Sequence, residues 1–170
     1  QQAVATTDPV RRITLISAFV MTWFTSVELG FNKPFNPLLG ETYELQTPNF
    51  NFMQNRSPII PDNGMVFRVD DLEQVKIWSN FQTTTWLTTK GVVINQLHPT
   101  FLEIGDEVYK IIPPTLSVHN LIMGAPYVDV GGTATVTNWF RGNQISNARL
   151  SSLTEGGGIK AMIKEQAVSY

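Results

Sequence analysis

The feature that most constrains the fold is a series of short β-prone runs between residues 65 and 139. Runs rich in Val, Ile, Thr, Phe and Trp occupy residues 65–69, 75–81, 92–97, 101–104, 107–112, 116–123, 127–130 and 133–139. Turn-forming residues separate most of them, as in Asp62-Asn63-Gly64, Lys90-Gly91, Gly105-Asp106, Pro113-Pro114, Gly124-Ala125-Pro126 and Gly131-Gly132. This pattern is typical of an antiparallel meander or barrel. It predicts a mainly β fold, an antiparallel curved sheet or partial β-barrel.

One helix precedes these runs. Asp8 is a good N-cap, Pro9 is a good first helical residue, and Gly30 supplies a stop. Between them, apolar residues recur close to the i, i+3, i+4, i+7 spacing, at Ile13, Ile16, Phe19, Val20, Trp23, Phe24 and Val27. The apolar run is interrupted by polar residues and is short for a bilayer span. We therefore expect a helix over residues 9–29 that packs against the sheet. A second long helical pattern is absent, which makes a βαβ sheet improbable.

Composition narrows the function classes. The chain has 170 residues, 42% hydrophobic and 15% charged, which fits a single globular domain over residues 1–170. Its formal net charge is −2, from 12 basic and 14 acidic residues, so no broad basic field is available for nucleic acid. It contains no cysteine and two histidines, which excludes disulfides and thiolate catalysis and argues against a zinc site. No cofactor is expected.

Catalytic constellations are weak. Candidate carboxylates lie beside turns, at Asp70, Asp71 and Glu73 and at Asp106 and Glu107, where solvated acids are expected. His119 sits in an apolar run with no nucleophile elbow to support a triad, so a structural histidine is favoured. The tryptophans have no binding-face period and are predicted to line a core or tunnel: Trp23, Trp78, Trp86 and Trp139. We therefore expect the chain to have no enzymatic activity.

The stretch from Lys33 to Leu45, K-P-F-N-P-L-L-G-E-T-Y-E-L, is unusual for its two prolines. Lys33 and Asn36 each precede a proline, which pushes them into extended geometry on a stiff loop. An ammonium donor and an amide held close together could grip a phosphate or a carboxylate. The alternative is a proline-rich connector whose lysine is simply solvated.

The same stretch resembles the K-P-F-N-P-L-L-G-E signature of the oxysterol-binding protein family. The likeness extends over nearly all of residues 8–145. Val118 to Gly124 resembles the family's V-H-N-I-I-x-G strand, and the remaining similar segments are Asp8-Pro9-Val10-Arg11-Arg12, Trp86 with Lys90-Gly91, Tyr127 to Asp129, and Gly132 to Asn138.

The resemblance implies a β-barrel with an internal tunnel that binds a sterol, a phosphoinositide or another phospholipid. It implies transfer of that lipid between membranes by a cytoplasmic protein that touches membranes only peripherally and transiently. Lys33 and Asn36 would hold the lipid head group at the tunnel mouth. The rival interpretation is a non-enzymatic, β-rich interaction module that has lost lipid binding.

Two departures from the family pattern bear on these alternatives. Residues 51–61 stand where the family carries E-Q-V-S-H-H-P-P, whose paired histidines bind the phosphate of phosphatidylinositol 4-phosphate, and they contain no histidine. Arg56 could replace one phosphate contact, or it could be an exposed loop arginine. The chain also resembles only the first half of the barrel, and residues 159–170 form a strand or short helix without a terminator. A fragment, a barrel completed by a partner and a smaller β fold are the three alternatives, and an open sheet edge is expected.

The loop hypothesis predicts a phenotype for Lys33 and Asn36. Lys33→Ala should weaken binding of anionic lipid about tenfold or more, because a hydrogen bond to a charged group is worth about 1.5–3 kcal/mol. Vesicle extraction of phosphoinositide and of sterol, measured separately for wild type, Lys33→Ala and Asn36→Ala, tests this. Phosphoinositide binding should fall while sterol binding persists. Unchanged phosphoinositide extraction in both variants would make the loop purely structural.

Overall fold

A computed structural model describes the chain over residues 2–25, 37–56, 65–71, 75–89, 91–124, 126–139, 145–152 and 161–168. Two helices come first, α1 (Gln2–Ala5) and α2 (Pro9–Thr25). The strands follow as β1 (Thr42–Gln46), β2 (Phe50–Arg56), β3 (Met65–Asp71), β4 (Val75–Phe81), β5 (Thr83–Thr88), β6 (Gly91–Gln96), β7 (Thr100–Ile104), β8 (Glu107–Ile112), β9 (Thr115–His119), β10 (Tyr127–Gly131), β11 (Thr133–Asn138), β12 (Ile145–Ser152) and β13 (Ala161–Val168).

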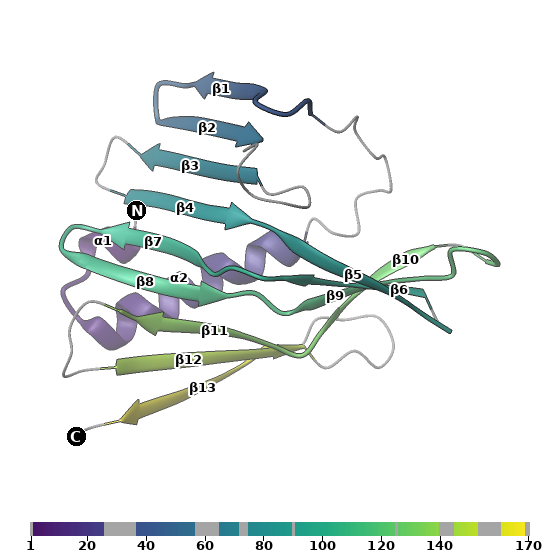
Figure 1. Ribbon diagram of the computed structural model, residues 1–170. Coiled ribbons are helices and arrows are strands. Elements are labelled where there is room, and N and C mark those ends of the chain that lie inside the picture. Colours follow the sequence, from purple (N-terminus) through teal and green to yellow (C-terminus); the bar gives the residue numbers. More distant parts are fainter. Residues whose placement is uncertain are drawn as a thin grey trace.

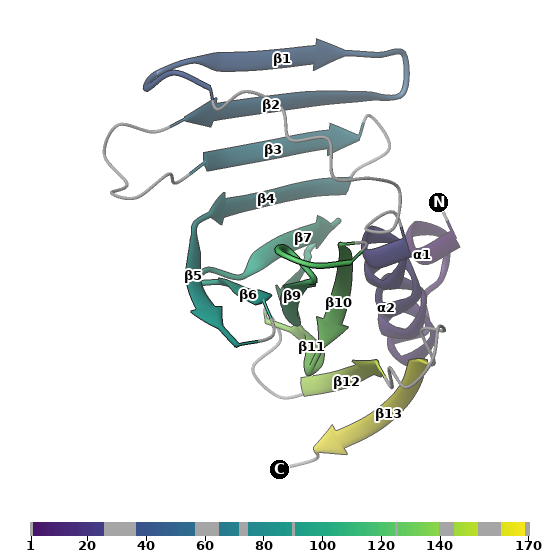
Figure 2. The same cartoon turned by 90° about the vertical axis from the view of Figure 1, so that its right-hand side faces the viewer.

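The strands form two antiparallel sheets. The larger has nine strands in the order β1-β2-β3-β4-β7-β8-β11-β12-β13, and the smaller has four in the order β10-β9-β6-β5. The large sheet bends, with both helices inside its curve (Figure 2). The small sheet projects from one end of it, because β4 continues almost directly into β5 (Figure 1). Within the described residues β1 and β13 are the two edges of the large sheet, so it is open rather than closed into a barrel. The predicted mainly β, antiparallel fold with one N-terminal helix against it is confirmed.

The element boundaries differ from the prediction in several places. The helix is confirmed over Pro9–Thr25, and residues 26–29 lie outside the described residues. The predicted 116–123 strand ends at His119, because Asn120 takes a positive φ of 59° that turns the chain. Residues 161–168 form a strand rather than a helix. The sequence patterns did not reveal α1, β1, β2, β5 or β12.

The core is the contact between α2 and the inner face of the large sheet. Ile13, Ile16 and Val20 share one helical face and are buried. They pack against a cluster from the three central strands, made up of Leu102, Ile104, Tyr109, Ile111, Ala134 and Val136. Burial alternates strictly along β7 and β8, as expected for strands with one covered face.

A polar cluster fastens the helix to the sheet. Arg12 Nη1 lies 2.7 Å from Glu107 Oε2, and the Tyr109 hydroxyl donates to the same oxygen at 2.5 Å. Arg12 also donates to the backbone carbonyls of Ala3 and Thr6, which ties α1 to the assembly. Burial lowers the pKa of Arg12, but the hydrogen bond and charge of Glu107 outweigh it and raise the pKa overall. We call Arg12, Glu107 and Tyr109 the clasp.

The clasp corrects the expectation that Glu107 is a solvated turn acid. Its exposed fraction is 7%, because it opens β8 on the inner face, toward α2. Asp106, its neighbour in the turn, is exposed as expected. A buried carboxylate requires a charged or hydrogen-bonding partner, and here the partner comes from a helix 95 residues earlier in the chain.

The small sheet depends on a close approach of two backbones. Gly91 opens β6 with a φ of +151° and pairs with His119 of β9. A Cβ at this position would lie 1.9 Å from the Val118 carbonyl oxygen. Only glycine therefore allows β6 and β9 to pair at this end of the sheet.

The clasp predicts a pH dependence of stability. Burial, followed by the hydrogen bond and charge of Glu107, raises the pKa of Tyr109 above its ordinary 10.0. The stabilisation from neutral Tyr109 is thus complete below about pH 10 and is lost as pH rises through the folded-state pKa. Tyr109→Phe should lower the free energy of unfolding by about 1.5–3 kcal/mol at pH 7. It should also flatten the decline above pH 10 in urea titrations. An equally steep decline in the variant would contradict this role.

A second prediction concerns Gly91. Gly91→Ala should lower the free energy of unfolding by about 3 kcal/mol or more, since the added methyl group cannot be accommodated without separating the strands. Gly105→Ala is the control, because Gly105 also has a positive φ of 56° but its Cβ would meet no atom within 4 Å. The control should lose only the backbone strain of about 1–2 kcal/mol. Equal losses in urea unfolding would show that the close approach is unimportant.

Candidate functional site

A cavity lies between the helices and the large sheet. Its volume is about 530 Å³, within the range of small-molecule sites. The helices contribute Gln2, Ala3, Val4, Leu15, Ile16, Ala18, Phe19 and Thr22, and strands β2, β4 and β7 contribute Phe50, Val75, Ile77, Leu102 and Ile104. Gln2 and Thr22 are the only polar residues among them. This larger cavity suits a hydrocarbon ligand, which is held by burial rather than by charge.

A smaller cavity of about 230 Å³ lies at the other end of α2, against the small sheet. Apolar side chains from several elements line it, namely Trp23, Phe24, Phe81, Ile94, Pro113, Pro114 and Leu116. Polar groups come from Thr83, Thr100 and Gln96. Among the described residues, Gln96 donates through Nε2 to the His98 carbonyl oxygen at 2.8 Å and to Ser79 Oγ at 3.3 Å. Its side-chain oxygen can accept a hydrogen bond from a hydroxyl group of a ligand.

Two neighbouring rings on the last turns of α2 line the two cavities, one each. The Phe19 ring lies against Trp23, edge to face, with centroids 5.6 Å apart. Phe19 lines the larger cavity and Trp23 the smaller. The clasp fixes the opposite end of the helix and holds α1 over the larger cavity through the Ala3 carbonyl.

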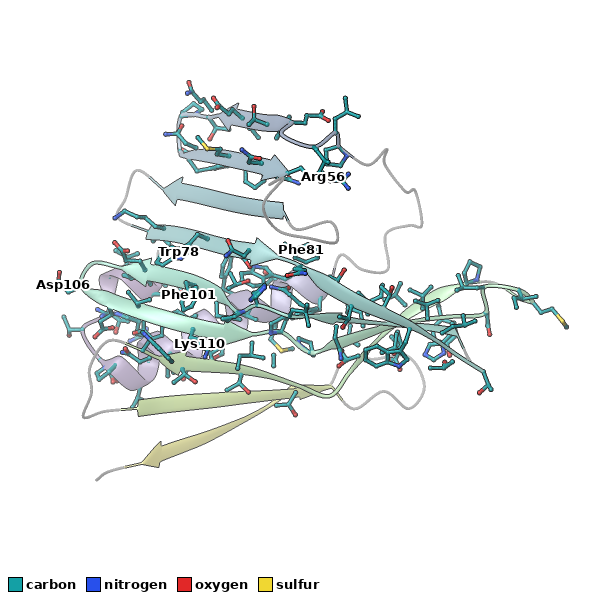
Figure 3. The ribbon with its side chains drawn as sticks, viewed as in Figure 1. Arg56, Trp78, Phe81, Phe101, Asp106 and Lys110 are labelled. Atoms are coloured by element: carbon teal, nitrogen blue, oxygen red, sulfur yellow. The ribbon has the colours of Figure 1, made fainter. Side chains whose placement is uncertain are left out.

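Arg56 ends β2 beside the loop that leads into β1 (Figure 3). Its Nη1 donates to the Pro37 carbonyl oxygen, and its backbone bonds to Gly40 at 2.8 Å and to Glu41 at 3.0 Å. The Glu41 carboxylate accepts from the Leu38 amide at 2.5 Å. Arg56 is thus a half-buried anchor of this loop, and the expectation of an exposed loop arginine is wrong. Lys33 and Asn36 lie outside the described residues.

The tryptophans divide in a way that their spacing did not predict. Trp23 lines the smaller cavity, which confirms the expectation for that residue. Trp78 stacks on Phe101 with centroids 5.6 Å apart, on the face of the sheet that alternation turns away from α2. Trp86 and Trp139 are exposed, and the Lys110 ammonium lies 4.7 Å above the Trp139 ring. The prediction that all four line a core or tunnel is wrong for Trp86 and Trp139, and Trp78 lines neither the core cluster nor either of the two cavities.

Several cavity residues could not be singled out from the sequence. Ala18, Phe19 and Thr22 lie on the flank of α2 next to its buried stripe. The available signal was the breadth of the apolar face, which continues past the core positions to Phe19 and Phe24. Breadth alone indicates that a helix is covered on two sides, and it does not tell whether protein or ligand covers the second side.

The described residues form neither a cluster of metal ligands nor a helix that could span a membrane. No group of three or more His, Asp or Glu side chains is gathered there as a metal site would require. Neither of its helices is long and apolar enough to cross a bilayer. His119 stacks on Tyr127 at 4.9 Å, which fits its expected structural role.

The sequence matches known proteins over most of its length. The family model described as Oxysterol-binding protein matches residues 1–156. Human oxysterol-binding protein-related protein 1 is 29% identical over 155 residues, covering 84% of this chain and 16% of that protein. Oxysterol-binding protein-related protein 3B of Arabidopsis thaliana is 30% identical over 144 residues, covering 82% of this chain and 31% of that protein. The chain therefore spans about a third or less of these relatives.

Solved structures show the same fold. The ORD domain of Osh1 in complex with cholesterol superposes with a TM-score of 0.77 at 21% identity, covering 89% of this chain and 37% of that one. The ORD of Osh3 from Saccharomyces cerevisiae in complex with PI(4)P gives 0.77 at 23% identity, covering 92% and 42%. Because the family model matches nearly the whole sequence, this chain belongs to the oxysterol-binding protein family.

Proposed function

We propose that this chain binds a lipid in the apolar space beneath α2 and takes part in moving it between membranes, without catalysis. The observation that carries the proposal is the larger cavity, whose walls are almost wholly apolar. Cholesterol, ergosterol and PI(4)P are bound by the structural relatives Osh1 and Osh3, which supports a sterol or a phosphoinositide as ligand. Because those domains are more than twice as long, the complete site would include residues beyond the range compared here.

The two cavities suggest how a ligand would be oriented. Hydrocarbon buried in the larger cavity would supply affinity, at about 25 cal/mol per Å² of apolar surface removed from water. A ligand hydroxyl could be recognised at the polar side of the smaller cavity, where the Gln96 side chain offers an acceptor. Lys33 and Asn36 remain the proposed head-group residues, and Arg56 would act chiefly by anchoring the Pro37–Glu41 loop. We propose that the protein works in the cytoplasm and touches membranes peripherally.

One observation favours a second candidate, a non-enzymatic β-rich interaction module that has lost lipid binding. Residues 51–61, which stand where the family's paired histidines are expected, contain no histidine, and their first part lies in strand β2. A sterol ligand needs no phosphate contact, so this difference weakens the phosphoinositide proposal more than the sterol proposal. Direct binding of each lipid separates the candidates.

Filling the larger cavity tests the proposed function. Ala18 lines the cavity but is not part of the core, so Ala18→Trp should occupy ligand space without disturbing packing. We expect dehydroergosterol affinity to fall about tenfold or more, since even a few lost methylene contacts amount to a decade. Thr14→Trp is the matched control, because Thr14 lies on the same helix outside the cavity. Equal sterol titrations for Ala18→Trp and wild type, with unchanged unfolding temperatures, would exclude this cavity as the site.

A further inference from the structure

The tip of the small sheet exposes large aliphatic side chains. After β9 the chain turns through Leu121, Ile122 and Met123, and the exposed fractions of the last two are 95% and 82%. Leu87, near the end of β5, is 79% exposed. Positive φ angles at Asn120 and Gly124 bracket the turn, and a Cβ added at Gly124 would lie 3.4 Å from Asn120 Nδ2. The aliphatic residues are thus presented at the end of a paired hairpin, the part of the small sheet farthest from α2 (Figure 1). Side chains at a hairpin tip cannot be covered by their own sheet.

Amphipathic rings stand directly behind the tip. The first row of paired residues across the small sheet contains His119 and Tyr127, whose rings stack. Trp86 lies two rows further back, about 7 Å along the strands, and alternation places it on the same face as this pair. From the tip backward, aliphatic residues come first, and Tyr and Trp follow. A bilayer has the same order of polarity, with acyl chains inside and an interface that favours Tyr and Trp.

The charge pattern agrees with this order of polarity. Residues 82–99 and 113–128 contain no Asp or Glu, although the chain has 14 of them. These two segments include β5, β6, β9 and the start of β10, the part of that strand nearest the tip. Their one permanently charged residue is Lys90, in the β5–β6 connection. The first acidic residue, Asp129, falls in the row of Trp86. Acidic side chains are therefore absent from the two rows nearest the tip, where they would repel anionic lipid head groups most, and Asp129 is the first to appear, in the third row.

The tip also faces the same way as the loop held by Arg56. Arg56 pairs with Met65, and Met65 pairs with Phe81, the last residue of β4. β5 then continues beyond Phe81 toward the tip. Figure 3 shows Arg56 and Phe81 toward this end of the large sheet and Asp106 at the opposite end. Leu38 and Leu39, in the Arg56-anchored loop, are exposed as well. The tip and the loop therefore lie toward the same end of the large sheet.

We propose that the Leu121–Met123 turn is a membrane-contact element that inserts its aliphatic side chains into a lipid bilayer. Tyr127, His119 and Trp86 then lie at the level of the head groups. The inference rests on the proposed function in one respect, namely that the protein works at membranes. It adds the surface that makes the contact.

Substitution of the tip tests the contact. The full-length protein carrying Ile122→Asp and Met123→Asp should lose about tenfold or more of its partitioning onto phosphatidylcholine vesicles containing phosphatidylserine, since two large apolar side chains leave the membrane. Val10→Asp is the control, because Val10 is also exposed but lies at the start of α2. It should partition like wild type in vesicle flotation. Equal partitioning of the tip variant and wild type would overturn the proposal.

A probe reports the contact directly. Because the chain has no cysteine, Met123→Cys creates a unique attachment point for an environment-sensitive fluorophore, and Val10→Cys gives the matched control. Vesicles should shift the emission of the label at position 123 to the blue and expose it to quenchers in the acyl chains, and leave the label at position 10 unchanged. A silent label at position 123 would overturn the proposal, and so would shielding of this label by a second protein copy instead of lipid.

The same variants separate this inference from the proposed function. Sterol loading from a dispersed solution requires no membrane, so the tip variant should load dehydroergosterol normally, whereas Ala18→Trp should bind vesicles normally and load poorly. If the wild-type protein loads sterol but does not insert into vesicles, only the membrane contact is overturned. Normal insertion without loading would overturn only the cavity.

Discussion

A helix about 10 Å wide cannot cover a sheet of nine strands, and this mismatch in size determines where the cavities lie. Nine strands at a spacing of about 4.8 Å extend roughly 38 Å across. Helix α2 buries its stripe against the three central strands, β7, β8 and β11. The inner face beyond them, at Phe50, Val75 and Ile77, remains apolar without being filled by helix side chains. The clasp then fixes the helix in position, so the uncovered strip persists as a cavity instead of collapsing.

The parts of the fold that could be predicted are those in which local pattern and burial agree. Residues 100–104 alternate between buried and half-buried positions, and residues 107–112 nearly so, which is why period-two reasoning located these strands. Strand β2 was not predicted, because its Asn- and Gln-rich sequence carries little hydrophobic signal and its stability comes from backbone pairing with β1 and β3. The role of Glu107 depends on Arg12, 95 residues away, a distance that no local pattern spans.

Local sequence pattern was also insufficient to predict the contacts of the candidate site. The motif around Lys33 identified the family, but motif spacing does not reveal contacts, and Arg56 proved to be bonded to Pro37 rather than exposed. The pattern of residues 116–123 predicts a strand that includes Leu121–Met123. A short apolar run looks the same in sequence whether it forms a strand or an exposed turn, and the positive φ of Asn120 distinguishes the two. The tip therefore lies within a segment that the sequence predicts as strand.

A protein that transfers lipid between membranes must bind each membrane reversibly. Full burial of a large aliphatic side chain is worth about 1.5–3 kcal/mol, and part of this is offset by the entropy lost on association. At the proposed contact, the few side chains of the tip would thus provide weak, reversible attachment, comparable in kind to the marginal binding of a single acyl chain. A net charge of −2 adds little long-range attraction to anionic membranes. Contact at the tip would orient the Arg56-anchored loop toward the bilayer for long enough that a ligand could exchange. Because the hydrophobic tip is small, the membrane-bound state would be short-lived.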